Sequence, residues 1–440
     1  MSKINTPSGF RDLLPKEARE RDFLIRTIIG VYQKFGFYPL ETPVAEFQEG
    51  IAGDKADDFN LFFLESNKDS KSDAKEEIAL RFDLTVPLAR VIGQYGDKLP
   101  RPFKRYQLGD VFRGERPQRG RYRQFVQLDA DVVGSKKIQT DVEMLLMIHE
   151  IMSSFMSDGF VIRVSSRKLI NLLPKFLSFD DSLLEKIVVL VDKSEKISQE
   201  DFRKELENFN LTETQNNSII EFASISKSPE TIMDALQSFF KDSEIAQDTI
   251  SEIGMLARGC VDLGISSHVS FDMNIVRGFG YYTGTVFETN IRGPQNIGSV
   301  VSGGRYDALT GRFSNESLPS IGVSAGVDRL HTVLSEMGIF SELLQTRKIV
   351  VFYREDFFAS YALDVAQSLR QNISDIEVDV YAGNKDDFKD IFKYCELVEA
   401  THLCIIDKRE FDAQSVTIKN LATREQNVCS LKQMLDIFNT

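Results

Sequence analysis

Glycine is distributed unevenly along this chain, and that distribution limits the folds open to it. From Asp180 to Ile253 there is no glycine and a single proline, Pro229, whereas residues 278–326 are rich in glycine. The stretch from Asp180 to Arg258 also carries 17 acids against 8 bases. Because glycine and proline interrupt helices, this stretch predicts an inserted helical module. Strand-like sequence on both sides of it predicts a sheet domain that the module interrupts.

Short apolar runs separated by loops precede the acidic stretch. They predict strands at 79–82, 103–108 and 123–133, in the pattern of an antiparallel sheet, and strand-like sequence resumes from His268 to Leu330. Apolar residues at helical spacing predict two helices. The first helix, ended by Gly36, would bury Leu24, Ile28, Val31 and Phe35, and the second would carry on one face Val142, Leu145, Leu146, His149 and Met152.

The C-terminal segment has a different pattern of predicted secondary structure, in which strands alternate with helices. After a linker around 337–346, strands are predicted at 348–353, 376–381, 403–407 and 415–421, and helices at 359–370, 385–398 and 431–438. Such alternation is typical of a small α/β domain with a largely parallel sheet.

Composition narrows the class of protein further. A chain of 440 residues is long enough for two to four domains, and no apolar run reaches the roughly 18 residues of a membrane span. The four cysteines form no CxxC pair, and the first residues lack the apolar core of a signal peptide. We therefore expect a soluble protein of the reducing cytoplasm without a zinc site.

Basic residues gather in one strip although the formal net charge is -13. Between Arg101 and Arg123 there are eight bases and two acids, and most of the bases lie in the loop from Phe112 to Phe125 between two predicted strands. Guanidinium groups held on strands can give bidentate hydrogen bonds to a polyphosphate. A solvated basic hairpin is the alternative interpretation.

Polar side chains alternate along the strand that leaves this hairpin. Gln127, Asp129 and Asp131 would emerge on one face, and Asp83 and Thr85 have the same spacing in an earlier segment. Acids in an apolar strand are costly to bury unless they bind something, which favours a ligand site. An ordinary solvent-facing sheet surface would produce the same alternation.

Two further clusters combine arginine with glycine. The first, Arg277 to Glu288, contains Tyr281 and Tyr282, and the second, Gly322 to Leu330, predicts a strand, a turn and a helix that carries Arg329. Glycine permits close backbone approach to a ligand, but a bent strand with core tyrosines fits as well. The four histidines lie in dissimilar contexts, with His149 expected in the core, and no catalytic triad is legible.

Together these segments resemble the histidyl-tRNA synthetases, which are class II aminoacyl-tRNA synthetases. The likeness rests on the arginine hairpin with Gln127 and Asp131, the Arg277 to Glu288 segment and the Gly322 to Leu330 segment. It extends to Gly9–Pro15 at the start, to a dimer-interface motif at 37–43, and to 416–421 near the end. The resemblance implies an α+β fold, in which an antiparallel-sheet catalytic core with a helical insertion is joined to a C-terminal α/β anticodon-binding domain. The implied boundaries are 1–170 and 261–336 for the core, 171–260 for the insertion and 347–440 for the last domain.

The resemblance also implies roles for individual residues. Arg277 and Arg113 would be the catalytic cations at the phosphates, and ATP would be bound by Arg113, Glu115, Arg121, Phe125 and Arg329. The pocket for L-histidine would consist of Asp83, Thr85, Gln127, Asp131, Tyr281, Tyr282 and Tyr306. The acceptor end of tRNA would meet Gln118 and Arg119, and no protein ligand is implied for a metal beyond the Mg²⁺ bound to ATP.

The implied activity is ATP-dependent ligation of histidine to its tRNA by a homodimer, through a histidyl-adenylate. One alternative is a histidine-sensing regulatory subunit of ATP phosphoribosyltransferase, which has the same fold. Such relatives usually lack the C-terminal domain and the ATP-contacting arginines, both of which are present here. Another alternative is a class II synthetase for threonine, proline or glycine, which does not share the Arg277 to Glu288 sequence.

Overall fold

The structure is a computed structural model that describes residues 5–52, 60–64, 77–241, 243–275, 282–293, 298–314, 316–344, 347–383 and 387–439. The chain forms two compact units, Met1–Phe340 and Ser341–Thr440. Among the described helices, none has the length and apolar character to cross a membrane.

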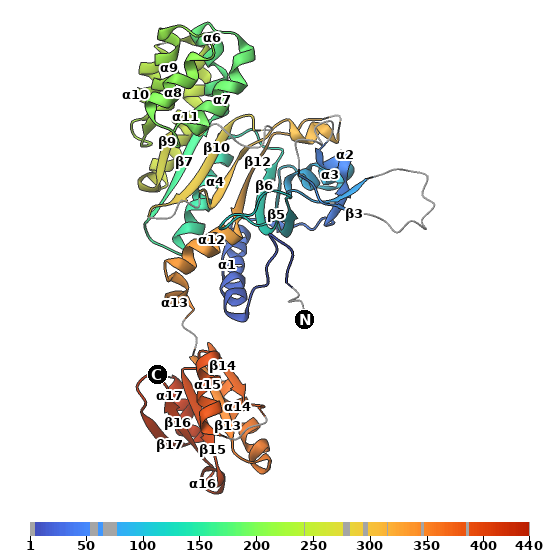
Figure 1. Cartoon of the computed structure of the whole chain (residues 1–440), viewed down its shortest axis with the longest axis vertical. Helices are drawn as coiled ribbons and strands as arrows, with labels where there is room; N and C mark the ends of the chain where they lie inside the picture. Colours follow the sequence, from blue (N-terminus) through green and yellow to red (C-terminus); the bar gives the residue numbers. More distant parts are fainter. Residues whose placement is uncertain are drawn as a thin grey trace, which may run out of the picture. The chain divides into compact units, whose positions relative to one another are not determined.

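A nine-stranded sheet organises the described part of the first unit (Figure 1). Its strands are, in spatial order, β1 (Tyr38–Pro39), β5 (Phe103–Phe112), β6 (Gln124–Val133), β12 (Ser320–Gly326), β11 (Val301–Arg305), β10 (Thr285–Ile291), β7 (Phe160–Ser166), β9 (Val269–Asp272) and β8 (Ser226–Lys227). Pairing is antiparallel except for β1 with β5 and β7 with β9. The predicted antiparallel core is confirmed, and strands distant in sequence meet at its centre.

Three helices pack on the sheet or on one another beside it: α1 (Pro15–Lys34), α4 (Ile138–Ser153) and α12 (Val327–Glu336), the last followed by α13 (Ile339–Leu343). In α1, Leu24, Ile28 and Val31 are buried as predicted, and Gly36 follows the helix with a φ of 78°. The face predicted for α4 is wrong in part. Its buried side chains include Met144, Met147, Ile148 and Ile151, whereas Val142, Leu146 and His149 are half-buried. The helix is apolar on so many sides that spacing alone did not select the buried face.

A smaller, three-stranded sheet also belongs to the first unit. Its strands are β2 (Ala45–Phe47), β4 (Ile78–Leu80) and β3 (Phe63–Leu64), accompanied by helices α2 (Gln48–Ala52) and α3 (Thr85–Tyr95). Within residues 37–43, the segment likened to a dimer-interface motif, the only strand is the two-residue β1, which pairs with Arg105 and Tyr106.

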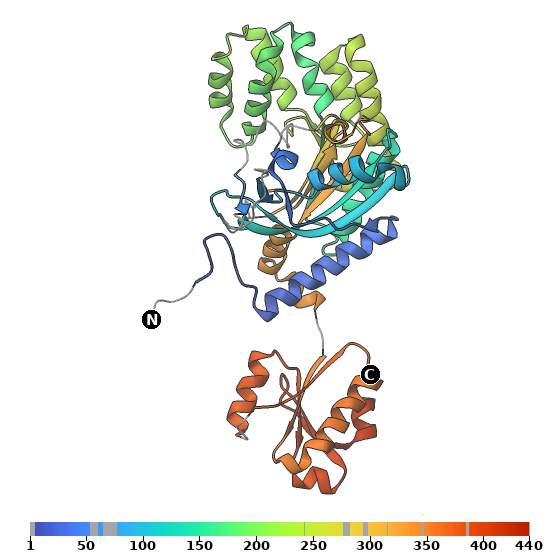
Figure 2. The same ribbon diagram turned by 90° about the vertical axis from the view of Figure 1, so that its right-hand side faces the viewer.

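The acidic stretch is helical, as predicted. It contains α7 (Leu184–Lys193), α8 (Gln199–Glu207), α9 (Glu213–Ala223), α10 (Ile232–Phe240) and α11 (Glu244–Asp262), and the short helices α5 (Arg167–Asn171) and α6 (Leu173–Leu177) precede it. The two-residue strand β8 also lies within this stretch and joins the large sheet. These helices form a layer beyond the large sheet (Figure 2). The longest of them, α11, returns to pack on α4.

The second unit has a five-stranded sheet in the order β14 (Ile376–Val380), β13 (Arg347–Tyr353), β15 (His402–Ile406), β16 (Ser415–Asn420), β17 (Gln426–Ser430). Its helices are α14 (Ala359–Asn372), α15 (Phe388–Leu397), α16 (Lys408–Asp412) and α17 (Leu431–Asn439). The predicted alternation is confirmed, but the largely parallel sheet is not. Only β14, β13 and β15 are parallel, because β16 and β17 return through short connections, and β17 was not predicted.

Candidate active site

One cleft in the first unit is lined by residues from each of the clusters singled out in the sequence. It holds about 980 Å³ of empty space, including its open mouth. Its lining contains all the described residues predicted to bind nucleotide or amino acid, namely Asp83, Thr85, Arg113, Glu115, Arg121, Phe125, Gln127, Asp131, Tyr282, Tyr306 and Arg329. Arg277 and Tyr281 lie outside the described residues. The antiparallel order of the sheet brings these side chains together.

Arg113 follows directly after strand β5 and is held against two aromatic rings. Its guanidinium carbon lies 4.4 Å from the ring centre of Phe82 and 5.0 Å from that of Phe125. Its Nε donates to the carbonyl oxygen of Phe82 at 3.2 Å. The cation is thus fixed in direction before any anion enters the cleft, which is the condition for electrostatic preorganisation.

The hairpin after Arg113 closes on a two-residue turn. The backbones of Gln118 and Arg121 exchange two hydrogen bonds of 2.9 Å, and Gly120 takes a φ of 68°, which favours glycine. Arg121 pairs with Glu115 at the cleft, whereas Arg119 reaches outward to Glu336. Gln118 and Arg119 are exposed and do not line the cleft.

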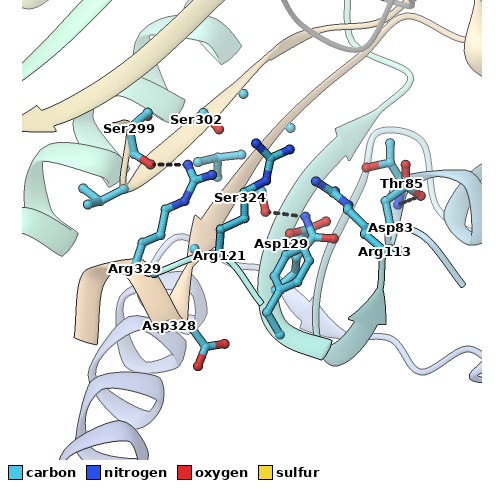
Figure 3. Close-up of a pocket in the computed structure, with 18 of the residues that line it drawn as sticks. Asp83, Thr85, Arg113, Arg121, Asp129, Ser299, Ser302, Ser324, Asp328 and Arg329 are labelled. Carbon is cyan, nitrogen blue, oxygen red and sulfur yellow. Dashed lines mark hydrogen bonds between the residues drawn. The ribbon is translucent and has the colours of Figure 1, made fainter. Parts of the chain in front are cut away.

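Arg329 enters the cleft from the first turn of α12. Its guanidinium donates to the carbonyl oxygen of Ser299 at 3.0 Å. Burial lowers the pKa of Arg329, and the nearby Arg121 lowers it further. Figure 3 shows the two guanidinium groups side by side. Two cations that repel each other in a partly buried cleft would be stabilised by an anion bound between them.

Asp328 anchors that helix to the sheet. One of its carboxylate oxygens accepts from the backbone N–H of Val126 at 2.8 Å, and the other pairs with Arg11 at 2.6 Å. Arg11 belongs to the N-terminal segment whose sequence matched the family opening. This segment therefore helps to hold the neighbouring Arg329 in place.

The deep end of the cleft is acidic and almost closed to solvent. Gln127, Asp129 and Asp131 alternate along β6, and each is buried. Asp131 lies opposite Arg105 on β5, and its carboxylate oxygens meet the Arg105 guanidinium at 2.7 Å and the Tyr306 hydroxyl. Burial raises the pKa of Asp131, while Arg105 lowers it. The ion pair and the phenol together hold this carboxylate in one orientation.

Strand β6 lies between β5 and β12, and Gly322 on β12 lies opposite Asp131. A Cβ atom at this position would lie 1.9 Å from the Asp131 Oδ1 atom. Only glycine leaves room for that carboxylate, which explains one glycine of the cluster that spacing alone left ambiguous.

Asp83 and Gln127 each have a local partner as well as a place in the cleft wall. The Oδ1 atom of Asp83 accepts from the backbone N–H groups of Thr85 and Val86 at 3.1 and 2.9 Å, at the start of α3. The Gln127 amide nitrogen donates to the Ser324 hydroxyl at 2.9 Å. Burial raises the pKa of the phenol of Tyr282, a half-buried residue at this end.

The structure shows charge and histidine contacts that the sequence patterns did not reveal. Within the basic strip, Arg105 is fully buried, and Lys104 pairs with Glu143 at 2.7 Å. His149, expected in the core, is half-buried, and its Nε2 atom lies 3.2 Å from His268 Nδ1. Their pairing joins α4 to the start of β9, a contact that their separation in sequence hides.

Asp129 lines the same cleft but was not among the residues that the family resemblance assigned to the pocket, although its alternation with Gln127 and Asp131 was a signal for it. Ser299, Ser302 and Ser324 line the cleft too, and nothing in their local sequence distinguished them. Burial raises the pKa of Asp129 to about 7, and Asp131 and Asp83 raise it against the opposing effect of Arg105.

The raised pKa of Asp129 predicts a pH-dependent effect on stability. The folded state keeps this proton up to about pH 7, whereas the unfolded chain releases it near its ordinary pKa, so the stability from this group is lost as pH rises between these values. Raising the pH from 5 to 8 should therefore lower the unfolding free energy of the unchanged chain by about 2 to 3 kcal/mol more than that of the Asp129→Asn variant. In this sense the variant gains stability relative to the unchanged chain as the pH rises. Unfolding free energies measured at both pH values test this, with the half-buried Asp110 of β5 changed to asparagine as control. An equal gain for both variants would contradict the assignment.

Comparison with known proteins identifies the family. The family described as "Histidyl-tRNA synthetase" matches residues 9–349, and that described as "Anticodon binding domain" matches residues 348–440. The histidine–tRNA ligase of Helicobacter pylori (strain G27) is 35% identical over 436 residues, which cover 98% of this chain and 97% of that one. The enzyme of the same name from Wolinella succinogenes is 34% identical over 433 residues, with coverage of 96% and 95%.

Solved structures give the same result. The crystal structure of histidyl-tRNA synthetase from Nostoc sp. PCC 7120 aligns over 99% of both chains with a TM-score of 0.86 and 32% identity. A protein described as ATP phosphoribosyltransferase regulatory subunit/histidyl-tRNA synthetase, from Bacillus halodurans, has a TM-score of 0.73 over 92% of this chain and 97% of that one. At 19% identity, the latter likeness shows the fold alone. The chain belongs to the histidyl-tRNA synthetase family.

Proposed function

We propose that this protein ligates L-histidine to its tRNA through a histidyl-adenylate, with release of AMP and pyrophosphate. The observation that carries the proposal is a cleft with fixed arginines at one end and a buried pocket of acids and phenols at the other. Attack of a carboxylate on the α-phosphorus brings one anion to another, and fixed cations stabilise the charge that develops. The acidic end suits the ammonium and ring N–H groups of histidine.

At the nucleotide end, Arg113 and Arg277 act on the phosphates as the catalytic cations. Arg121 and Arg329 hold the outer phosphates, Glu115 lies at the adenine region, and Phe125 stacks on the base. The support for this assignment is the placing of Arg113 against Phe125 and of Arg329 close to Arg121. Mg²⁺ arrives with ATP as part of the substrate.

At the histidine end, Asp83 and Thr85 address the amino group, and Gln127 contacts the backbone of the amino acid. Asp131 and Tyr282 contact the imidazole, with Tyr281 and Tyr306 completing the pocket. The fixed orientation of Asp131, set by Arg105 and the Tyr306 hydroxyl, supports its role. An analogue without ring polar atoms would leave this buried carboxylate without a partner and would be rejected.

The tRNA is proposed to contact both units of the chain. The exposed hairpin tip, with Gln118 and Arg119, meets the acceptor end, and residues 347–440 bind the anticodon. The exposed position of the tip beside the cleft supports the first contact, and the anticodon-domain match supports the second. The domain boundaries given above, 1–170, 171–260, 261–336 and 347–440, are part of this proposal.

Histidine-dependent exchange of pyrophosphate into ATP tests the reaction. The purified chain should catalyse the exchange with Mg²⁺ and histidine, and the rate should fall to background when other amino acids replace histidine. Exchange without preference for histidine, or its absence under these conditions, would refute the proposed function.

The protein is further proposed to act in the cytoplasm as a homodimer formed through the segment around Pro43. Exposed apolar side chains near this segment support the contact, since Tyr38 is 71% and Phe47 is 52% exposed. Light scattering at micromolar concentration should give twice the mass of the 49.9 kDa chain. The mass of one chain would contradict the dimer.

A further inference from the structure

Three carboxylates lie at the deep end of the cleft, and two of them already have partners. Asp131 contacts the Arg105 guanidinium and the Tyr306 hydroxyl, and one oxygen of Asp83 accepts two backbone hydrogen bonds. Asp129 differs from both. Its Oδ1 atom is buried and has no hydrogen-bond partner among the described residues, although the side chain is only 2% exposed and lines the cleft.

A buried carboxylate oxygen without a donor is costly, and such atoms in a binding cleft are commonly completed by a ligand. The donor must come from the cleft. The neighbouring strands provide Gln107 on β5 and Ser324 on β12 opposite Asp129. The Ser324 hydroxyl already accepts from the Gln127 amide nitrogen, and no described group donates to Asp129 Oδ1, so this oxygen is the acceptor left for the ligand.

The position of Asp129 along β6 indicates which part of the ligand it meets. Asp129 lies between Gln127 and Asp131 along the strand, two residues or roughly 6.6 Å from each. Gln127 is on the side of the nucleotide, and Asp131 is at the deep end of the pocket. In the proposed function, Gln127 contacts the amino-acid backbone and Asp131 the imidazole. Asp129 faces the space between these groups, and Asp83, the carboxylate proposed to address the amino group, lines the same cleft.

We infer that Asp129 binds the α-ammonium group of the amino-acid substrate, as a partner to Asp83. This inference rests on the proposed function for the identity of the amino acid. The ammonium donates to Oδ1 of Asp129, and its positive charge offsets the repulsion between two neighbouring carboxylates. A substrate of the same shape without the ammonium leaves both acids uncompensated, so the site selects amino acids over deaminated analogues.

Isothermal titration calorimetry with two ligands tests the inference. The ligands are L-histidine and 3-(imidazol-4-yl)propanoate, in which hydrogen replaces the ammonium group. Asp129→Asn should weaken histidine binding by about 10- to 100-fold, the range for a hydrogen bond to a charged group. The same variant should change binding of the deaminated analogue less than about threefold, because the lost contact involves only the ammonium. Asp129→Ser should give the same pattern, and ATP binding together with circular dichroism reports whether each variant is folded.

The control is Asp110→Asn on the neighbouring strand, outside the cleft lining, which should leave both affinities unchanged. Equal weakening of both ligands by Asp129→Asn would place Asp129 at the ring or show a general loss of the pocket, and unchanged histidine affinity would show no contact. Either result overturns the inference. Failure of the unchanged chain to bind histidine at all would instead refute the proposed function.

Discussion

Replacing Arg113 by alanine is expected to lower the rate of histidine-dependent ATP–pyrophosphate exchange by about 10²- to 10³-fold. The guanidinium is fixed by Phe82 and Phe125 and points into the cleft. Its removal therefore eliminates a charge that stabilises the transition state without reorganisation. The loss should appear mainly in kcat, because the interaction grows stronger as charge develops on the phosphates.

Arg116→Ala provides a matched control for this variant. Arg116 lies in the same hairpin, is exposed and does not line the cleft. Its loss changes the charge of the hairpin equally and should leave exchange within about twofold, because screened surface charges interact weakly. Equal losses from both variants would show that the hairpin acts through its total charge, contrary to the assigned role of Arg113.

Replacing Arg105 by methionine is expected to destabilise the first unit by about 3 to 5 kcal/mol. Arg105 is completely buried, with its guanidinium 2.7 Å from Asp131 and 3.0 Å from the Leu84 carbonyl oxygen. Methionine has a similar length but no charge, so Asp129 and Asp131 would be left buried without a cation. Urea unfolding of the full chain, followed by circular dichroism, measures the effect.

Two comparisons make this result specific. Arg119→Met breaks an ion pair in which the arginine side chain is 62% exposed, and it should cost less than about 1 kcal/mol. Adding Asp129→Asn to Arg105→Met should restore part of the lost unfolding free energy, because the neutral amide replaces one of the two carboxyl groups that are buried without a cation. A loss from Arg105→Met no larger than that from Arg119→Met would mean that the buried cation does not stabilise these acids.

Much of the fold follows from local patterns in the sequence. The period of Leu24, Ile28 and Val31 predicted α1, and the alternation in the last segment predicted most of the second unit. These patterns are local because a helix or strand face is set by residues that are close in sequence. The helix α4 is apolar on several sides, so its buried face depended on which helices and strands pack against it in the folded chain.

The residue types of the cleft can be read from the chain's own sequence, and the family likeness indicated the positions that would carry them. The sequence could not show that Arg105 is the buried partner of Asp131, since it looked like one base among eight in a basic strip. That pairing, the space left by Gly322 and the unpartnered oxygen of Asp129 arise only when β5, β6 and β12 adopt their register. Cross-strand neighbours are distant in sequence, so the tertiary structure alone decided which charges meet and which one remains for a ligand.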